Sequence, residues 1–464
     1  MFAKIINWIR RLLKTSTTDG AVSQDIIISP KMENSIAMWD KMYRNESPWA
    51  DGKKVVSLNL ASAIASEFAT LVTLEFKSAL SGSPRADYLN TVYQYVINHI
   101  HREVEFAGAY GSKVFKPYVN GNEICIDFIN ADCFLPLAFD SSGRMTAVIF
   151  YSQINRDNKI FTRLEKHELI GTDYTITNKA FVSSTNANLG REIELSSVPE
   201  WQDLASSFVI KNVDRPLFGL MKVALANNVD TNSPLGVSIF SRAVELIREA
   251  DKQFSRLKWE FEGGELAVDA AADCLQPIGN TDCPGVLPEH SDRLFRKISN
   301  SDPDFYKVFS PALRDNSLVN GLNKIFQRIE FNCGFAYGTI SDPQNVDKTA
   351  EEIKTSKQRS YSMVTLNQKA LENALTDLAY AMDVYTTLYN LAPAGEYKQT
   401  FDFSDSVLTD ANKEQAIRLA EVTAGIVKGE NYLAWRYSIT EDEAKKMMPE
   451  KVDMKNPFGF NEEQ

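Results

Sequence analysis

Apolar residues at helical spacing mark the first hundred residues of the chain. The segments with this spacing are 33–43, 60–81 and 86–105. In the second segment, five apolar residues fall on one helical face: Leu60, Ile64, Phe68, Leu71 and Phe76. Because Gly82-Ser83-Pro84 follows, that helix should end there. We therefore expect a helical N-terminal region.

The apolar pattern changes to a period of two beyond residue 110. Segments 113–119 and 122–128 flank Asn120-Gly121, a strong hairpin signal. A second hairpin is expected between 133–139 and 145–153. The pattern continues through 160–167, 174–177, 180–183 and 192–195. Short polar turns between consecutive strands favour antiparallel pairing.

Two further helices are expected around a proline-rich stretch. The first, 237–262, is unusually charged and should end at Gly263-Gly264. The second, 317–332, has a heptad-like stripe, namely Leu318, Leu322, Ile325 and Ile329. Residues 265–315 between them hold several prolines, which predicts a small separate lobe of loops and strands.

A polar, turn-rich segment at 334–348 precedes a very long helix, 349–391. Helix connections in bundles are usually shorter, so this length favours a functional loop. The long helix has a repeating apolar stripe of Leu371, Leu375, Leu378, Met382, Tyr385 and Tyr389. Segment 397–403 should be a strand that pairs with an earlier one. Helices at 410–428 and 441–448 follow, the latter with Thr440 and Glu443 as a capping box.

Composition places the chain among folded proteins of more than one lobe. It has 464 residues, of which 44% are hydrophobic and 24% charged. The net charge of −11 argues against a protein that grips nucleic acid, because phosphate contacts need a basic surface. This net charge is compatible with a protein that does not contact DNA, and also with one that contacts DNA loosely and lets it slide.

Residues 1–14 form an amphipathic pattern, with apolar residues on one helical face and Lys4, Arg10, Arg11 and Lys14 on the other. Such a helix either lies on a membrane surface or packs on protein, and we favour packing. The five cysteines are widely spread, which argues against a disulfide framework or a structural zinc site.

Signatures of catalysis are absent from the sequence. It has neither a P-loop motif nor a Gly-x-Ser-x-Gly elbow. His99 and His101 diverge if their segment is helical, and Cys274, Cys283 and His290 do not match zinc spacings. We therefore expect no enzyme activity, no catalytic residue, no metal and no cofactor.

Several segments of the chain resemble the portal proteins of tailed phages, especially those of siphophages and prophages of Gram-positive bacteria. They include 38–49, 106–124 and 345–375. The last is the most specific, because Lys348, Thr349, Ala350 and Glu352 match a stretch that leads into the family's long helix. Glu351 stands where the family usually has Thr.

The resemblance implies an α+β portal fold with a wing of helices and antiparallel strands, a two-helix stem, a small α/β clip, a long inner helix and a helical crown. The implied segments are the wing at 1–235, the stem helices at 236–262 and 316–333, the clip at 263–315, the tunnel loop at 334–348, the long helix with a returning wing strand at 349–409, and the crown at 410–464.

The resemblance also implies a function. The chain would form a ring, expected to be a dodecamer, at one capsid vertex, and would conduct double-stranded DNA during packaging and ejection. Its implied partners are the large terminase subunit, the major capsid and scaffolding proteins, and a head-completion adaptor, with no membrane. The ring would be assembled in the host cytoplasm and reside in the virion. Alternatives are a membrane-associated scaffold and an unrecognised hydrolase.

Two groups of residues are candidates for the site. The proposed DNA-channel residues of the tunnel loop are Tyr337, Gly338, Thr339, Ile340, Ser341, Asp342, Gln344, Asn345, Asp347 and Lys348. The proposed charges for contacts between stems are Arg242, Glu245, Arg248, Glu249, Lys252 and Arg256.

Overall fold

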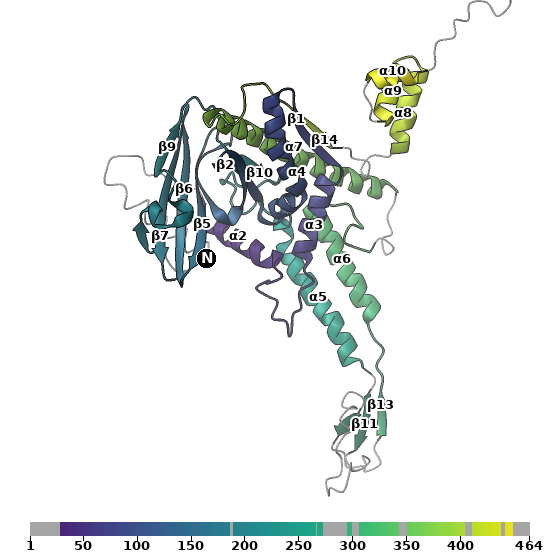
Figure 1. Ribbon diagram of the computed structural model, residues 1–464. Helices are drawn as coiled ribbons and strands as arrows, with labels where there is room; N and C mark the ends of the chain where they lie inside the picture. Colours follow the sequence, from purple (N-terminus) through teal and green to yellow (C-terminus); the bar gives the residue numbers. More distant parts are fainter. Residues whose placement is uncertain are drawn as a thin grey trace, which may run out of the picture. The chain divides into compact units, whose positions relative to one another are not determined.

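The structure is a computed structural model of the whole chain. It describes residues 28–185, 189–265, 267–271, 295–298, 306–342, 350–403, 411–437 and 441–448. The chain divides into two units, Met1–Phe403 and Ser404–Gln464. The first unit combines helices with sheets that are antiparallel, as the sequence predicts, except for the parallel pair β11–β12 (Figure 1). The amphipathic segment 1–14 lies outside the described residues.

The first unit begins with three helices, α2 (Pro30–Tyr43), α3 (Leu60–Thr73) and α4 (Pro84–Tyr110). A serine caps two of them, because Ser29 Oγ accepts a hydrogen bond from Met32 N and Ser83 Oγ accepts one from Ala86 N. Each of these helices also starts with proline at its first position, where the missing N–H costs nothing. Helix α3 packs closely on α4.

The prediction of one helix over 60–81 is wrong at its end. Helix α3 stops at Thr73, and Phe76–Ser81 forms strand β1. Its side chains alternate between buried and exposed, a period-two pattern that the helical reading of Phe76 overlooked. Strand β1 pairs antiparallel with β14 (Lys398–Phe403), which confirms that the late strand returns to an earlier one. The Phe76 and Phe403 rings stack with centroids 4.6 Å apart.

A small sheet has the strand order β10-β2-β3, formed by β2 (Ser112–Asn120), β3 (Glu123–Asn130) and β10 (Gly219–Lys222). The hairpin around Asn120-Gly121 is confirmed, with Asn120 opposite Glu123. Strand β10 was not predicted from the sequence. This strand runs against the long helix so closely that a Cβ on Gly219 would lie 2.1 Å from the Ala374 carbonyl oxygen.

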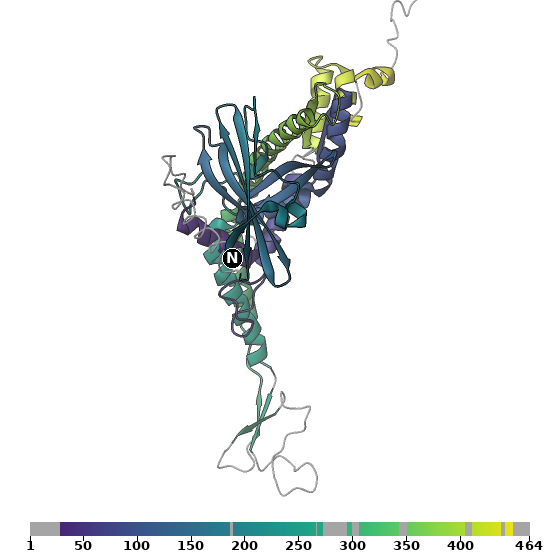
Figure 2. The ribbon, with the colours of Figure 1, turned by 60° about the vertical axis from the view of Figure 1, so that its left-hand side comes forward.

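A larger antiparallel sheet has the order β4-β5-β6-β7-β8, with β9 also paired to β7 (Figure 2). Its strands are β4 (Phe134–Phe139), β5 (Met145–Arg156), β6 (Lys159–Ile170), β7 (Asp173–Ser183), β8 (Arg191–Ile193) and β9 (Ser207–Ile210). The hairpin between β4 and β5 is confirmed. Segments 174–177 and 180–183, expected as two strands, belong to the single strand β7.

Buried charges join the two sheets. Lys116 Nζ on β2 lies 2.7 Å from Glu165 Oε2 on β6, and His167 Nε2 lies 2.8 Å from Glu165 Oε1. Burial alone would raise the pKa of Glu165, but Lys116 and His167 hold that pKa well below its ordinary value. Burial lowers the pKa of His167. The carboxylate is therefore ionised and paired at neutral pH.

The second half of the first unit contains α5 (Val244–Gly263), α6 (Asp315–Cys333) and α7 (Ala350–Leu388). Helix α5 begins later than the expected residue 237, because a 3-10 turn at Ser241–Ala243 precedes it. Between α5 and α6, the described residues form a sheet of order β12-β11-β13, from β11 (Ala267–Ala271), β12 (Phe295–Ile298) and β13 (Tyr306–Phe309). Strands within 265–315 are thus confirmed.

Helix α7 packs against β10, β2, α3 and α4. Its predicted stripe is confirmed from Leu371 to Tyr385, all buried, whereas Tyr389 is exposed beyond the end of the helix. Arg85, which is 5% exposed at the start of α4, forms an ion pair with Asp383 of α7. Its Nη2 also donates to the Asp383 carbonyl oxygen at 2.6 Å. This buried guanidinium fixes α7 to the N-terminal helices.

The second unit contains α8 (Ala411–Thr423), α9 (Gly429–Tyr437) and α10 (Glu441–Met447). The expected helix at 410–428 is shorter than predicted, because the backbone turns at Gly425, whose φ is +70°. Helix α9 was not expected. The guanidinium of Arg418 on α8 lies 4.4 Å from the centre of the Trp435 ring on α9. Thr440 of the predicted capping box lies outside the described residues.

Candidate functional site

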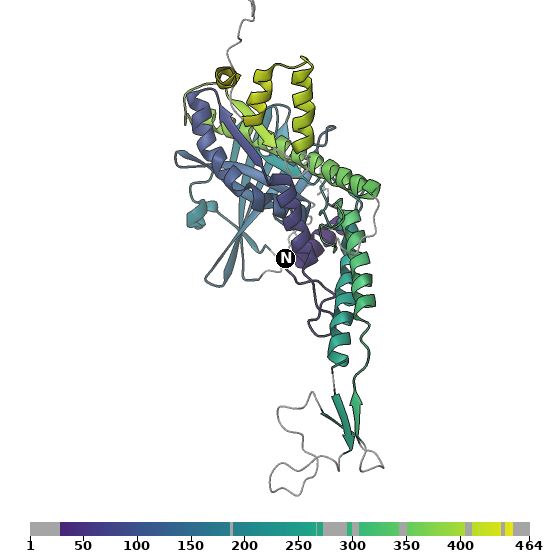
Figure 3. The same ribbon diagram turned by 90° about the vertical axis from the view of Figure 1, so that its right-hand side faces the viewer.

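The helices α5 and α6 run antiparallel, side by side (Figures 1 and 3). Their facing residues include Ile247 and Ala250 on α5, and Leu322 and Ile329 on α6, all of them buried. Near the end of α5, Glu260 accepts two hydrogen bonds from the Arg314 guanidinium, at 3.0 and 2.7 Å. These hydrogen bonds lower the pKa of Glu260 to about 2.

The chain between α2 and α3 is fastened to α5 through Asp251. This side chain is fully buried, and its carboxylate accepts hydrogen bonds from Trp49 Nε1 and Leu58 N, both at 2.8 Å. Burial raises the pKa of Asp251 in spite of these donors. The paired helices are thereby held at a fixed position on the N-terminal helices.

The charges predicted for contacts between stems lie mostly on the exposed side of α5. Within the chain, Glu245 pairs with Arg248 at 3.5 Å, and Glu249 pairs with Lys252 at 2.7 Å. Arg242 donates to the Ala226 carbonyl oxygen, and Arg256 donates to Gln253 Oε1. The structure therefore gives each of these charges a partner in its own chain.

Large apolar side chains are also exposed along this helix pair. Trp259 is 67% exposed, and the others are Phe261, Leu313, Val319 and Phe331. In a chain whose other large apolar residues are mostly in the core, such exposure on two paired helices is typical of a surface that another protein covers.

The segment after α6 folds back onto that helix. Gly334, with φ +80°, ends α6, and Phe335 is completely buried. Glu330 in the last turn of α6 is also fully buried, and its carboxylate accepts the backbone N–H groups of Gly338, Ile340 and Ser341 at 3.1, 2.6 and 2.8 Å.

Two more contacts hold the same segment. Asn323 Oδ1 accepts a hydrogen bond from Asp342 N at 2.8 Å. The Arg359 guanidinium of α7 lies 4.6 Å from the centre of the Phe331 ring and 5.2 Å from that of Tyr337. Residues 334–342 are thus fixed to α6 and α7, and they determine where the chain starts toward residue 343.

The structure brings together the first six of the predicted loop residues, from Tyr337 to Asp342. Of these, Ser341 is 3% exposed and Asp342 is exposed. Gln344, Asn345, Asp347 and Lys348 lie outside the described residues. Sequence reasoning missed Glu330, Asn323 and Arg359. Their types carry no signal of this role, since a polar residue on a long helix ordinarily faces solvent.

Within the described ranges, no group of three or more His, Cys, Asp or Glu side chains could hold a metal ion. The helices in that part of the chain are all too short or too polar to cross a bilayer.

The fold and this site define a class of protein with long paired helices that bracket a small strand lobe, a segment anchored at their end, and a separate helical unit at the C-terminus. A model of the family described as "Phage portal protein, SPP1 Gp6-like" matches residues 56–456. The chain belongs to this family of phage portal proteins. Portal proteins are structural components of the virion, where they form homo-oligomeric rings.

A search of curated proteins found no match. Among solved structures, the chain is similar to one titled "Neck of native GTA particle computed with C12 symmetry", with a TM-score of 0.38 and 9% sequence identity, over 93% of this chain and 98% of that one.

Proposed function

We propose that twelve copies of this chain close into a ring through which double-stranded DNA enters and leaves the phage head. Family membership supports the ring. The exposed apolar side chains of α5 and α6, Trp259 foremost, support the helix pair as the place where neighbouring subunits meet. In a head-to-tail contact, one face of the helix pair meets a different face of the neighbouring pair. Such contacts close into a ring when the rotation between neighbouring subunits is a whole fraction of 360°.

The charges on α5 and on the 3-10 turn before it would contribute to the same contact. Arg242, Glu245, Arg248, Glu249, Lys252 and Arg256 include both signs. Exposed pairs within one helix are worth little, about 0.3–0.5 kcal/mol each. These side chains can therefore leave their partners and pair with charges on a neighbouring stem at a small cost in free energy. Such pairs between subunits would favour one orientation of the ring contact.

The tunnel loop at 334–348 is the part of the chain that we place nearest the DNA. Its first residues, through Asp342, act as a fixed base, because Glu330 and Asn323 hold their backbone. Contact with DNA is then expected from Gln344, Asn345, Asp347 and Lys348 and from the exposed side chain of Asp342. Each copy brings a net charge of −11, so the channel would not bind the phosphates of the passing DNA tightly.

The remaining segments take the family's roles in this proposal. The clip at 263–315 would dock the large terminase subunit and later the head-completion adaptor. The wing at 1–235 would meet the major capsid and scaffolding proteins during assembly in the host cytoplasm, and the crown at 410–464 would face the capsid interior. The ring would catalyse no reaction, and ATP hydrolysis would belong to the terminase.

Removing residues 343–348 tests the tunnel loop. This deletion spares the donors that Glu330 needs, whereas a deletion starting at 338 would leave a buried carboxylate without partners. We expect rings of normal mass and heads that package or retain much less DNA. A second variant, with the same six residues replaced by glycine and serine, separates loop length from loop chemistry. Normal packaging and retention by the deletion variant would refute the placement.

A further inference from the structure

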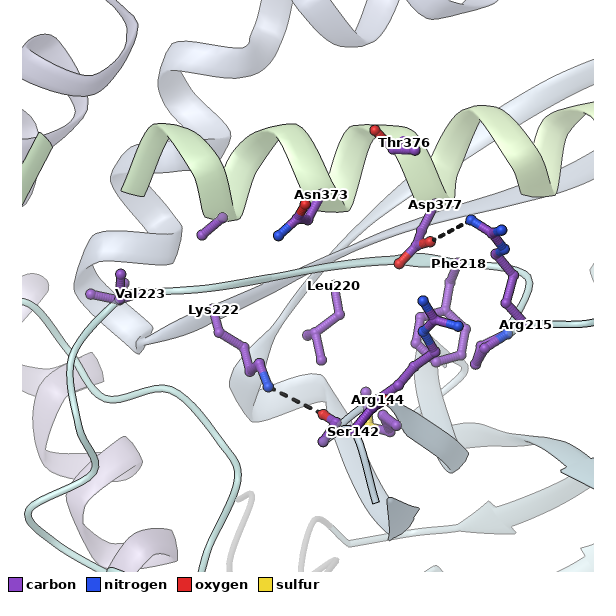
Figure 4. A pocket seen from close by; sticks show the side chains of 15 residues that line it. Ser142, Arg144, Arg215, Phe218, Leu220, Lys222, Val223, Asn373, Thr376 and Asp377 are labelled. Carbon is purple, nitrogen blue, oxygen red and sulfur yellow. Dashed lines mark hydrogen bonds and ion pairs between the residues drawn. The ribbon is translucent and has the colours of Figure 1, made fainter. Parts of the chain in front are cut away.

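A cavity of about 560 Å³ opens between the turn joining β4 to β5, strand β10 and helix α7 (Figure 4). Three cationic side chains line it: Arg144 from the turn, Arg215, and Lys222 from β10. The lining includes one carboxylate, Asp377 of α7, in this described part of the chain. Positive charge thus exceeds negative charge here, although the chain as a whole carries −11.

The turn that presents Arg144 is fixed by its own hydrogen bonds. Asp140 Oδ1 accepts from Ser142 N at 2.8 Å, from Ser142 Oγ at 2.6 Å and from Arg144 N at 2.9 Å. These bonds lower the pKa of Asp140, the one from Ser142 Oγ most strongly. Gly143 has φ +78°, a conformation that glycine adopts without strain. The backbone therefore holds Arg144 at the cavity in advance of any ligand.

Arg215 is also held in place. Its guanidinium lies 4.6 Å from the centre of the Tyr380 ring, and its Nη1 lies 3.4 Å from Asp377 Oδ1. Its Nε lies 3.3 Å from Asp214 Oδ1, so two carboxylates face Arg215 and neither forms a close bidentate pair with it. Figure 4 shows the Arg215 guanidinium beside the Asp377 carboxylate and the Arg144 guanidinium below that carboxylate.

Among the described residues lining the cavity, Lys222 is the cation without an anionic partner. Its Nζ donates to the Gly143 carbonyl oxygen at 3.3 Å. Arg144 is attracted by the carboxylates of Asp377 and Asp140 but forms no close ion pair with either. Burial lowers the pKa of Lys222, because its charged form is partly removed from water. An anion in the cavity would offset that desolvation.

We propose that this cavity binds a small organic phosphate. Guanidinium groups match the oxygens of a phosphate through paired hydrogen bonds, and an ammonium adds a point charge. Ser142, Asn373 and Thr376 supply further polar atoms at the lining. The apolar residues Met145, Phe218, Leu220 and Val223 line the rest, and the volume lies in the range of small-molecule sites, so the ligand carries an organic group beside its phosphate.

Calorimetric titration of the purified full-length chain in phosphate-free buffer tests this site. The probes are adenosine monophosphate, inorganic phosphate, adenosine and glutamate. We expect saturable binding of the nucleotide, binding of inorganic phosphate at least about tenfold weaker, and no binding of the other two. Absence of nucleotide binding at about 1 mM, or equal binding of glutamate, would overturn the proposal.

Matched variants locate the binding. Lys222→Met and Arg144→Gln should each weaken nucleotide binding at least about tenfold, whereas Lys159→Met, an exposed lysine on β6, should change it less than about twofold. Unfolding temperature without ligand checks that each variant is folded, and Arg144→Gln changes an exposed side chain, so it keeps the test available if Lys222→Met misfolds. Equal weakening by Lys159→Met would overturn the proposal.

Discussion

Glu330 holds Ser341 by both of its carboxylate oxygens. Oε1 accepts the Ser341 backbone N–H at 2.8 Å, and Oε2 accepts the Ser341 hydroxyl at 2.9 Å. Both side chains are buried. The start of the segment after α6 is therefore fixed to the paired helices. Any movement of the proposed tunnel loop should be confined to the residues beyond Asp342.

Replacing Glu330 by alanine should destabilise the chain and release this segment. The backbone N–H groups of Ile340 and Ser341 and the Ser341 hydroxyl lose their acceptor, whereas the Gly338 N–H keeps Ser341 Oγ. A buried donor left unpaired costs about 1–3 kcal/mol when water cannot take the place of the carboxylate. We expect a loss of about 3 kcal/mol in denaturant unfolding and faster trypsin cleavage after Lys348.

Glu245→Ala is the matched control for Glu330→Ala. Its side chain is 81% exposed and pairs with Arg248 along the surface of α5, so its removal should cost less than about 0.5 kcal/mol. Equal stability and equal cleavage rates for the two variants would show that Glu330 does not anchor the segment.

Replacing Trp259 by glutamate should weaken the ring and leave the single chain intact. The Trp259 side chain is 67% exposed in one chain, so a charge there costs little until a neighbour covers it. Sedimentation velocity should show dissociation at concentrations where the unsubstituted ring is stable. The control is Ile170→Glu on β6, where the isoleucine is 68% exposed. If Trp259→Glu forms rings as readily as the Ile170 variant, the stem contact lies elsewhere.

The ion pair between Glu260 and Arg314 should give the paired helices a dependence on pH. The pKa of Glu260 is lowered from 4.5 to about 2 by the Arg314 hydrogen bonds, so its stabilisation is complete at neutral pH and is lost as the pH falls from about 5 toward 2. Glu260→Gln should therefore lower the unfolding temperature at pH 7, and this difference should shrink toward pH 3. Glu262→Gln, on the same helix, serves as the control. A difference that is independent of pH would contradict the assignment.

Gly219→Ala should be among the most damaging small changes in the first unit. The added Cβ would lie 2.1 Å from the Ala374 carbonyl oxygen, so β10 and α7 would have to separate, at a cost of about 1–3 kcal/mol. Gly321→Ala in α6 is the opposite case. There the nearest atom is Gln253 Nε2 at 3.4 Å, and alanine favours a helix by about 0.5–1 kcal/mol. Equal stability of both variants in denaturant unfolding would contradict the close contact.

The sequence predicts the elements whose periodicity is strong. The Asn120-Gly121 hairpin and the buried stripe from Leu371 to Tyr385 follow from local patterns, and the structure confirms both. Strand β1 was misread because Phe76 falls in phase with the preceding helix, so its pairing with Phe403, far along the chain, decides its conformation. Such long-range pairing leaves no local signal.

The sequence singles out segment 334–348 but does not predict how the segment is anchored. The length of segment 334–348 identifies it as unusual, yet the role of Glu330 depends on how the chain turns back after Gly334. The cations Arg144 and Lys222 are 78 positions apart in the numbering and meet only through the contact of β10 with α7 and the β4–β5 turn. No spacing rule connects them.

The mass and shape of the purified chain test the central claim most directly. Twelve chains of 52.1 kDa should give a particle of about 0.6 MDa by light scattering, with an annulus around a central channel in negatively stained micrographs. A monomer of 52.1 kDa that persists across protein concentration and ionic strength would contradict the account.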